Sequence, residues 1–301
     1  MSPPVHEDDN EETHSLDGLS LMLIGGFTER SKKLAALYST QTKEFEMLPN
    51  LPVPCESPCS AAVDGRLVYV AGGLNENQDE IGTLQIYDTV TKTWKVSNKE
   101  LIMKRDGAAA GVINDALYIT GGQSEDSCGC LSSIEKLDLT SEESSLLSIT
   151  LQVERWLHCV VSKDNWLYIL GGQSGDRVLN SCEAINPFTA GRQKIFSMRS
   201  PRKQFAAVYL NDCIYAIGGM SRNNKYLSTV ECFSFKKKSW QFVSSMHKPR
   251  CGHCAYVVDG KIYVVGGVEA NSVEMYDPKK RSWSMQCEFE IPRICSAIVR
   301  L

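Results

Sequence analysis

A pair of adjacent glycines recurs six times along this 301-residue chain, and its spacing constrains the fold more than any other feature. The first glycines of successive pairs lie 47, 49, 50, 47 and 48 residues apart. A fixed period of this size indicates repeated supersecondary units, none of which can bury its apolar face alone. The sequence therefore predicts one domain of stacked repeats. The pairs are Gly25-Gly26, Gly72-Gly73, Gly121-Gly122, Gly171-Gly172, Gly218-Gly219 and Gly266-Gly267.

The residues around each glycine pair predict four short strands per repeat. In the fifth repeat, apolar runs at 204–209 and 213–217 flank a turn at Asn211-Asp212, which is typical of a β-hairpin. A polar loop then leads to runs at 228–233 and 239–242, which predict a second hairpin. Its two strands carry aromatic residues seven apart in four repeats, and the third and fourth repeats lack the tryptophan. These aromatic steps are Tyr38 to Phe45, Tyr87 to Trp94, Phe233 to Trp240 and Tyr276 to Trp283.

Composition and charge narrow the class of protein and of partner. No apolar run approaches the roughly 18 residues that indicate a membrane span, and the N-terminus lacks the order of a signal peptide. We therefore expect a cytosolic or nuclear protein with no membrane partner. Residues 1–17 hold six acidic residues and no Lys or Arg, so we expect a disordered tail or linker remnant before a domain at 18–301. The remaining charge of +2 does not favour nucleic-acid binding.

The twelve cysteines do not predict a disulfide framework, because such frameworks occur in short secreted chains. We expect reduced thiols that pack as small apolar groups. Cys251-x-x-Cys254 and Cys128-x-Cys130 lack a second pair at a spacing that zinc requires, so no metal is predicted. Phosphate-loop, dinucleotide and Gly-x-Ser-x-Gly motifs are absent, and no cofactor is predicted.

Four-stranded repeats of this length match the blades of a β-propeller, which hides its sheet edges by radial repetition. The glycine pair, the tyrosine that precedes five of the six pairs, Tyr276-Asp277-Pro278 and the seven-residue step to tryptophan resemble the kelch repeat from residue 19 onward. The Met-x-x-x-Arg phrase at 246–250 is similar to that of BTB–kelch proteins. The resemblance implies an all-β, six-bladed kelch propeller with four antiparallel strands in each blade.

The two ends of the chain are expected to share one blade. The chain starts with a glycine-pair strand that has no preceding partner, and residues 295–299 read like the first strand of a blade with no continuation. Closure of this kind predicts that removing residues 293–301 destabilises the whole ring.

Charged residues recur at one position of the repeat, sixteen residues before the first glycine. Because strands alternate in direction, this position and the loop after the glycines lie on the same face. We therefore expect a ring of guanidinium groups around the mouth of the central channel, suited to bind carboxylates. The alternative is that each arginine stacks or pairs between blades as part of the framework. The residues are Arg105, Arg155, Arg202 and Arg250, with Arg293 in the split blade and Glu56 in the sixth place.

Neighbouring residues extend this predicted partner-binding set. Trp156 and Phe205 are candidate anchors for a protein partner, and His158 and His253 join them, with core packing as the alternative for a histidine. Glu56 would interrupt the ring of positive charge and favour a basic residue in the ligand. The polar loops at 75–80, 124–130 and 221–225 are candidates for selectivity.

The predicted function is non-enzymatic recognition of a protein. In the kelch family the corresponding arginines contact bound peptide, so the resemblance implies an acidic peptide or degron as the ligand. It also implies the substrate receptor of a cullin-type ubiquitin ligase adaptor, through a BTB region absent from this chain. Actin is an alternative partner. A sialidase-type propeller enzyme, with Glu56 or Asp106 as its acid, is disfavoured because the Ser-x-Asp-x-Gly-x-x-Trp boxes are missing.

Overall fold

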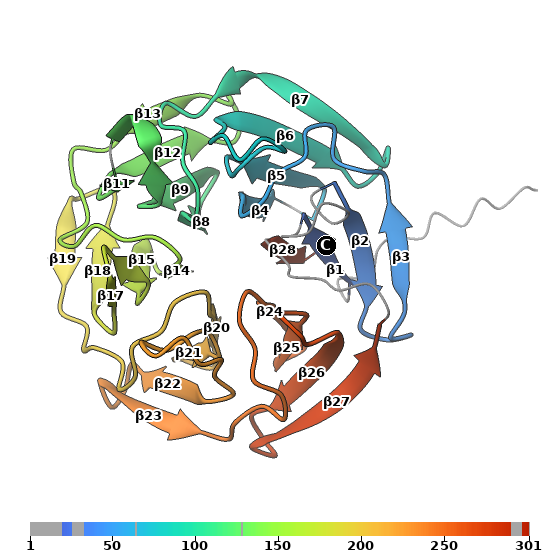
Figure 1. The fold of residues 1–301 in the computed structure, drawn as a ribbon, viewed down its shortest axis with the longest axis vertical. Coiled ribbons are helices and arrows are strands. Elements are labelled where there is room, and N and C mark those ends of the chain that lie inside the picture. Colours follow the sequence, from blue (N-terminus) through green and yellow to red (C-terminus); the bar gives the residue numbers. More distant parts are fainter. Residues whose placement is uncertain (1–19, 26–32, 64, 128, 290–296, 301) are drawn as a thin grey trace, which may run out of the picture.

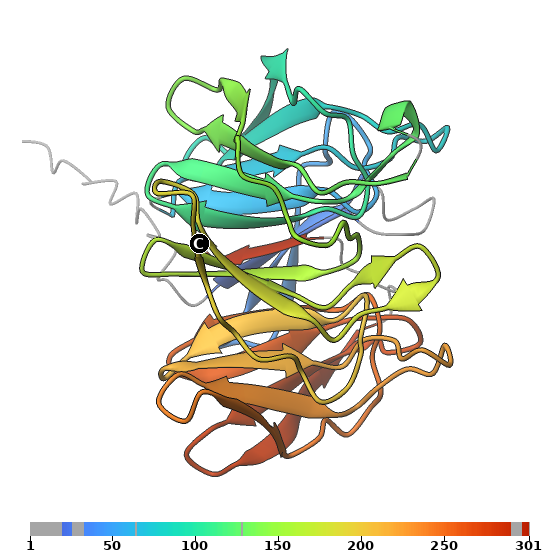
Figure 2. The ribbon, with the colours of Figure 1, turned by 90° about the vertical axis from the view of Figure 1, so that its left-hand side faces the viewer.

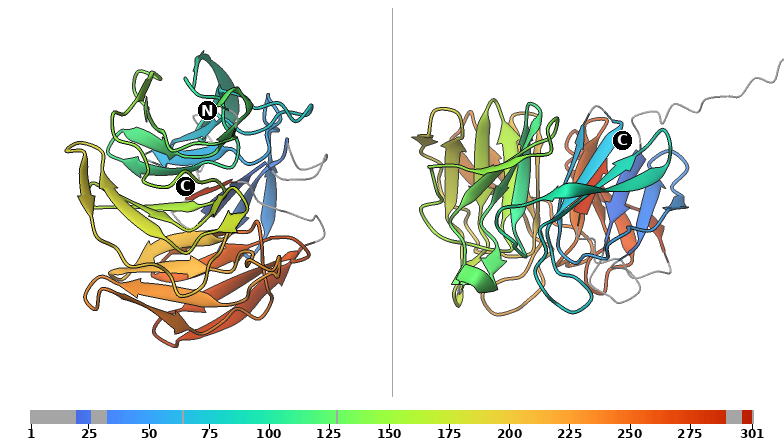
Figure 3. Two further views of the ribbon diagram at one scale, coloured as in Figure 1. Left: turned by 60° about the vertical axis from the view of Figure 1, so that its left-hand side comes forward. Right: turned by 90° about the horizontal axis from the view of Figure 1, so that it is seen from above.

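The structure, a computed structural model, describes residues 20–25, 33–63, 65–127, 129–289 and 297–300. These residues form six four-stranded antiparallel sheets arranged around a central channel (Figure 1). In the side view of Figure 2 the sheets of successive blades stack face to face, and Figure 3 shows the same arrangement from two other directions. The predicted all-β, six-bladed propeller with four strands per blade is confirmed. The predicted tail at 1–17 and Arg293 lie outside the described residues.

The blades are numbered along the chain. Blade 1 contains β28 (Ala297–Arg300), β1 (Ser20–Ile24), β2 (Ala35–Ser39) and β3 (Phe45–Leu48); blade 2 contains β4 (Cys59–Val63), β5 (Leu67–Ala71), β6 (Thr83–Asp88) and β7 (Thr93–Glu100). Blade 3 contains β8 (Ala109–Ile113), β9 (Ala116–Thr120), β12 (Ile134–Asp138) and β13 (Ser144–Leu146); blade 4 contains β14 (Cys159–Lys163), β15 (Trp166–Leu170), β18 (Cys182–Asn186) and β19 (Gly191–Gln193). Blade 5 contains β20 (Ala206–Leu210), β21 (Cys213–Ile217), β22 (Val230–Ser234) and β23 (Ser239–Val243); blade 6 contains β24 (Cys254–Val258), β25 (Lys261–Val265), β26 (Ser272–Asp277) and β27 (Ser282–Glu288).

Two of the polar loops that follow glycine pairs contain short elements of their own. In blade 3, β10 (Gln123–Ser124) pairs with β11 (Gly129–Cys130) around the 3-10 helix η1 (Glu125–Ser127). In blade 4, β16 (Gln173–Ser174) pairs with β17 (Arg177–Val178). These hairpins add regular secondary structure to the face of the propeller that carries the glycine-pair loops. No helix in the described part of the chain has the length and apolar character needed to cross a membrane.

Blade 1 combines strands from both ends of the chain. β28 pairs antiparallel with β1, with Leu21 opposite Arg300 and Ile24 opposite Ala297. In Figure 1 β28 lies at the centre of the propeller, between β24 and β4. How much this pairing stabilises the ring stays a prediction, and its test is given in the Discussion.

The core lies between adjacent blades, where apolar side chains of neighbouring sheets interdigitate. Three tryptophans of the outer strands also connect blade to blade. The indole N–H groups of Trp94, Trp240 and Trp283 donate to backbone carbonyls that precede their own blades, at 2.9, 2.7 and 2.8 Å. In blade 4, which lacks the tryptophan, Arg192 takes the same register and donates to the carbonyl of Thr150 at 2.5 Å. An arginine thus replaces the tryptophan as the donor between blades 3 and 4.

The first glycine of a pair packs against the connection to the next blade, and the second packs against the connection that enters its own blade. Gly172 has a φ of 93°, and a Cβ there would lie 2.6 Å from the carbonyl oxygen of Trp156. Gly171 has a φ of 57°, and its Cβ would lie 2.7 Å from the carbonyl oxygen of Arg202. Both positions need left-handed backbone and space that a side chain would fill. The glycine pairs are therefore structural.

Candidate functional site

The four arginines that the sequence places around the channel mouth lie inside the blades. Each is at most 1% exposed and forms an ion pair with a buried glutamate of the third strand of its own blade. The expectation of an exposed guanidinium ring is therefore wrong for these residues, and they are not proposed to touch a partner. The pairs are Arg105–Glu135 at 3.0 Å, Arg155–Glu183 at 2.8 Å, Arg202–Glu231 at 2.7 Å and Arg250–Glu274 at 2.9 Å.

The direction of the side chain explains this correction. Each guanidinium group extends beneath its own glycine pair and donates to the carbonyl of the first glycine, as Arg202 does to Gly218 at 2.8 Å. The paired carboxylate also accepts backbone N–H groups of the connection, as Glu231 does from Arg199 and Ser200 at 2.7 and 3.0 Å. The ion pair therefore ties the connection, the glycine pair and the third strand together.

Blade 2 carries a neutral version of this arrangement, and its arginine place is taken by Cys55 rather than Glu56. Cys55 is buried, and the amide of Gln85 contacts its sulfur at 3.8 Å. Gln85 also accepts the N–H of Val53 at 2.9 Å, as the glutamates do in other blades. Counting sixteen residues back from the first glycine gives Glu56 instead of Cys55, because the turn between β4 and β5 has three residues. The corresponding turns in the other described blades have two. The paired change to Cys and Gln leaves no buried charge without a partner.

The residues that line the channel mouth lie two places after the buried position. Glu56, Asp106, Trp156 and Lys203 come directly after it and form β-bridges with the loops that follow the glycine pairs. In blades 2 to 6 the next residue has a positive φ of 50–64° and lines a mouth cavity of about 120 Å³. The N–H groups of Leu157, Gln204 and Gly252 donate to the carbonyl of the equivalent residue one blade earlier, at 2.7–3.0 Å. These lining residues are Ser57, Gly107, Leu157, Gln204 and Gly252.

The predicted histidines and Phe205 are packing groups between blades. His158 and His253 are 5% and 4% exposed, and their Nε2 atoms contact the Thr120 hydroxyl at 2.8 Å and the Ile217 carbonyl at 3.1 Å. Burial lowers the pKa of His253 to about 3, so its ring is neutral. Phe205 is buried against Gly171. All three also line the mouth cavity. The core-packing alternative therefore describes the two histidines best.

The loop-bearing face is electrostatically divided. The loops of blades 2 and 3, here called the acidic half, expose Glu76, Asp79, Glu125 and Asp126, and Glu80 accepts the N–H of Glu125 at 2.9 Å. Blade 5, here called the basic half, presents Lys203, Arg222 and Lys225. Lys203 reaches across to the side-chain oxygen of Gln173 at 2.6 Å. A ligand across the mouth therefore meets opposite charges at its two ends.

Asp106 lies in the acidic half and is partly buried. Burial raises its pKa to about 6, and the charges of Glu56 and Glu80 act in the same direction. The folded protein therefore binds this proton more tightly than the unfolded chain, whose aspartate titrates near 3.8. Ionised Asp106 destabilises the fold above pH 6, and this effect disappears as the pH falls below about 4.

Replacing Asp106 by asparagine is expected to raise the free energy of unfolding by about 1–2 kcal/mol at pH 7.5, because the buried charge is removed. The gain should vanish at pH 4, where Asp106 is protonated. Urea denaturation at the two pH values measures both quantities. The exposed Asp176→Asn is the matched control and should change stability by less than about 0.5 kcal/mol. If Asp106→Asn were less stable than wild type at pH 7.5, the ionised carboxylate of Asp106 could not be destabilising the fold.

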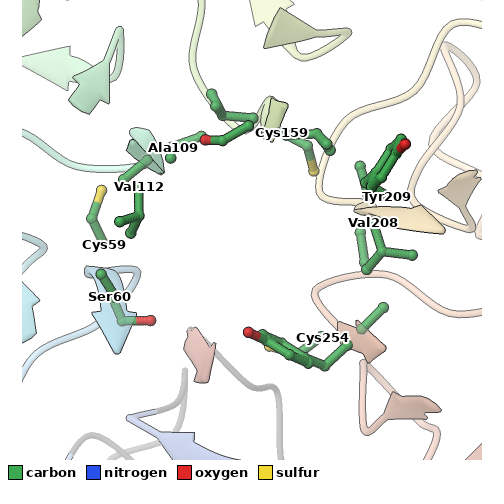
Figure 4. Close-up of a pocket in the computed structure, with 18 of the residues that line it drawn as sticks. Cys59, Ser60, Ala109, Val112, Cys159, Val208, Tyr209 and Cys254 are labelled. Carbon is green, nitrogen blue, oxygen red and sulfur yellow. The ribbon is translucent and has the colours of Figure 1, made fainter. Parts of the chain in front are cut away.

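The channel itself is a cavity of about 580 Å³ lined by the innermost strands. Figure 4 shows residues such as Ser60, Val112 and Val208 around its open centre. The ten cysteines within the described ranges are free thiols, and burial raises the pKa of Cys59 and Cys159 to about 12. In the same part of the chain, no three His, Cys, Asp or Glu side chains converge as a metal site.

Comparisons with known proteins agree with the propeller fold. A family model described as "KLHDC2/KLHL20/DRC7 Kelch-repeats domain" matches residues 59–267, and one described as "Kelch motif" matches residues 249–286. Kelch-like protein 23 of Homo sapiens is 26% identical over 234 residues, which cover 75% of this chain and 40% of that protein. Kelch-like protein 26 of Danio rerio is 30% identical over 151 residues, 47% of this chain and 25% of its own. Kelch repeat protein C2 of Vaccinia virus is 28% identical over 168 residues, 55% of this chain and 31% of its own. The chain thus spans less than half the length of these relatives.

Proposed function

The chain belongs to the kelch-repeat family, and on that premise we propose that it is a protein-binding propeller that takes a peptide segment of its partner at the channel mouth. The observation that carries this proposal is the divided charge around the mouth cavity. Acidic residues of the ligand meet Lys203, Arg222 and Lys225, and a basic residue meets Asp79, Glu125 and Asp126 of the acidic half. We therefore propose that the acidic ligand expected from the sequence binds to the surface cations of blade 5.

The half-buried side chains of Trp156 and Leu157 supply apolar contact area beside these charges. Trp156 lies over Gly107 of blade 3, and its indole N–H is buried without a hydrogen-bond partner among the described residues. Aromatic anchors of this kind contribute much of the energy of protein interfaces.

The role of the whole protein is proposed from its longer relatives. We propose a substrate receptor of a cullin-type ubiquitin ligase, which connects to the ligase through a BTB region and acts in the cytosol or nucleus. The propeller contributes the contact with the substrate in this scheme.

A double variant at the mouth tests the proposed function. Leu157→Asp with Lys203→Glu is expected to lose the partners that the wild-type chain captures from cell lysate. Its affinity for a purified partner segment, measured by calorimetry, should be at least tenfold lower than that of the wild-type chain. Aspartate tolerates the left-handed backbone of residue 157 better than leucine, so the fold should be kept. Val90→Asp with Lys279→Glu makes a matching pair of changes, one aliphatic to acidic and one lysine to glutamate, at exposed turns of the opposite face and should retain the partners. Equal capture by all three proteins would refute the mouth as the binding site.

A further inference from the structure

A separate cavity of about 220 Å³ lies between blades 4 and 5. Part of its wall is the turn between β22 and β23, which lies on the face opposite the glycine-pair loops because strands alternate in direction. We propose that this cavity binds an aromatic side chain presented by an acidic peptide segment of a partner protein. The lining residues are Tyr168, Gln193, Lys194, Ile195, Phe233, Phe235 and Lys238.

The cavity is associated with the short outer strand of blade 4. β19 has three residues, whereas β7 has eight and β27 has seven. The chain leaves the sheet after Gln193, and Lys194 and Ile195 line the cavity instead of continuing a strand beside blade 5. The outer hairpin of the fourth repeat, which like that of the third lacks the tryptophan, is therefore next to this opening.

Three aromatic rings form one wall of the cavity. The ring of Phe235 lies 5.2 Å from that of Tyr168 and 5.3 Å from that of Phe233, in edge-to-face geometry in both cases. Aromatic pairs favour this arrangement, and a further ring can add to such a cluster. The volume is below the roughly 300–1,000 Å³ of sites for drug-sized ligands. The cavity therefore suits a single side chain.

The hydroxyl of Tyr168 adds a polar group to this wall. Tyr168 is 4% exposed and lines the cavity. Tyr69 occupies the same position in blade 2 and donates to the carbonyl of Leu139 at 2.7 Å. The phenol of Tyr168 suits a ligand that brings an acceptor oxygen in the same way.

The rim of the cavity is positively charged. Lys194 and Lys238 line it, and the ammonium group of Lys163 lies 5.3 Å from the centre of the Phe235 ring. Lys236 and Lys237 are exposed in the adjoining turn. The acidic groups nearby are Asp164, which pairs with Lys163, and Asp212, which contacts the Tyr209 hydroxyl at 3.4 Å. Because neither lines the cavity, lysines dominate its rim and favour carboxylates that flank the inserted ring.

A labelled hexapeptide of sequence Glu-Asp-Glu-Phe-Asp-Glu tests the proposal by fluorescence polarisation with the purified chain. We expect it to bind at least tenfold more tightly than the same peptide with alanine in place of phenylalanine. Ile195→Trp, which fills the cavity, should reduce binding at least tenfold while circular dichroism stays unchanged. Equal affinity for the two peptides, or no binding of the phenylalanine peptide to the wild-type chain, would overturn the proposal.

Charge-reversed variants distinguish binding of the peptide at this cavity from non-specific electrostatic attraction to the protein surface. Lys194→Glu with Lys238→Glu should lower the affinity for the phenylalanine peptide at least tenfold. Lys279→Glu with Arg281→Glu makes the same change in net charge in the corresponding turn of blade 6, Arg281 being the counterpart of Lys238, and should stay within twofold of wild type. Equal losses in both would contradict a specific site. The Leu157→Asp, Lys203→Glu variant should bind the peptide normally, so failure at the mouth and failure at this cavity are distinguishable.

Discussion

Replacement of Arg202 by methionine is expected to lower the free energy of unfolding by about 3–5 kcal/mol, the usual cost of removing one partner of a buried ion pair. The Glu231 carboxylate is fully buried and would keep only its two backbone N–H donors. The carbonyls of Gly218 and Thr229 would also lose the donors that now lie at 2.8 and 3.2 Å. Urea denaturation followed by circular dichroism measures the loss.

Two further variants decide how the loss arises. The double variant Arg202→Met, Glu231→Gln copies the neutral Cys55–Gln85 arrangement of blade 2 and should recover at least half of the lost stability. Arg66→Met removes an exposed pair with Asp88, at 3.0 Å, and should cost less than about 1 kcal/mol. If Arg202→Met cost no more than Arg66→Met, the framework role of the buried arginines would be wrong.

Removal of residues 293–301 is expected to destabilise the whole propeller, by on the order of 5 kcal/mol. The deletion removes β28, so β1 loses one of its two partner strands and blade 1 loses its innermost strand between β24 and β4. Because each blade is held mainly by its two neighbours, opening the ring at one blade weakens all of them. Thermal and urea denaturation of the shortened chain give the size of the effect.

A strand-addition experiment controls for unspecific effects of truncation. A synthetic peptide of residues 293–301 should restore stability in proportion to its concentration, because it can pair with the exposed edge of β1. Deletion of residues 1–17 should change stability by less than about 0.5 kcal/mol. A chain without residues 293–301 that melts like the intact chain would refute closure by the terminal strands.

The buried glutamates can be recognised in the sequence, although not by counting residues from the glycine pairs. Glu135, Glu183, Glu231 and Glu274 lie 30, 28, 29 and 24 residues after their arginines, because the intervening loops differ in length. Glu231, Glu274 and Gln85 each stand two residues before the aromatic residue that begins the seven-residue step. Glu135 and Glu183 stand two residues before Leu137 and Ile185, which take the equivalent third-strand position in blades 3 and 4. Measured from the third strand, the acidic register is constant and indicates a buried partner for the arginine.

Other features depend on contacts that no count along the chain reports. Arg192 replaces a tryptophan because its guanidinium reaches the same kind of backbone carbonyl in the preceding blade. The cavity between blades 4 and 5 depends on where β19 ends relative to Phe233 and Phe235. Both features join segments about 40 residues apart, so local pattern carries no information about them.

The glycine pair and the strands around it were enough to establish the propeller, the number of blades and the face on which the arginines begin. Those properties follow from local backbone geometry and from the period of the repeat. The role of the arginines was decided only by the folded protein, because a long side chain can point outward to a ligand or back beneath the glycines. The buried glutamates, which lie on another strand, hold each guanidinium group inside its blade.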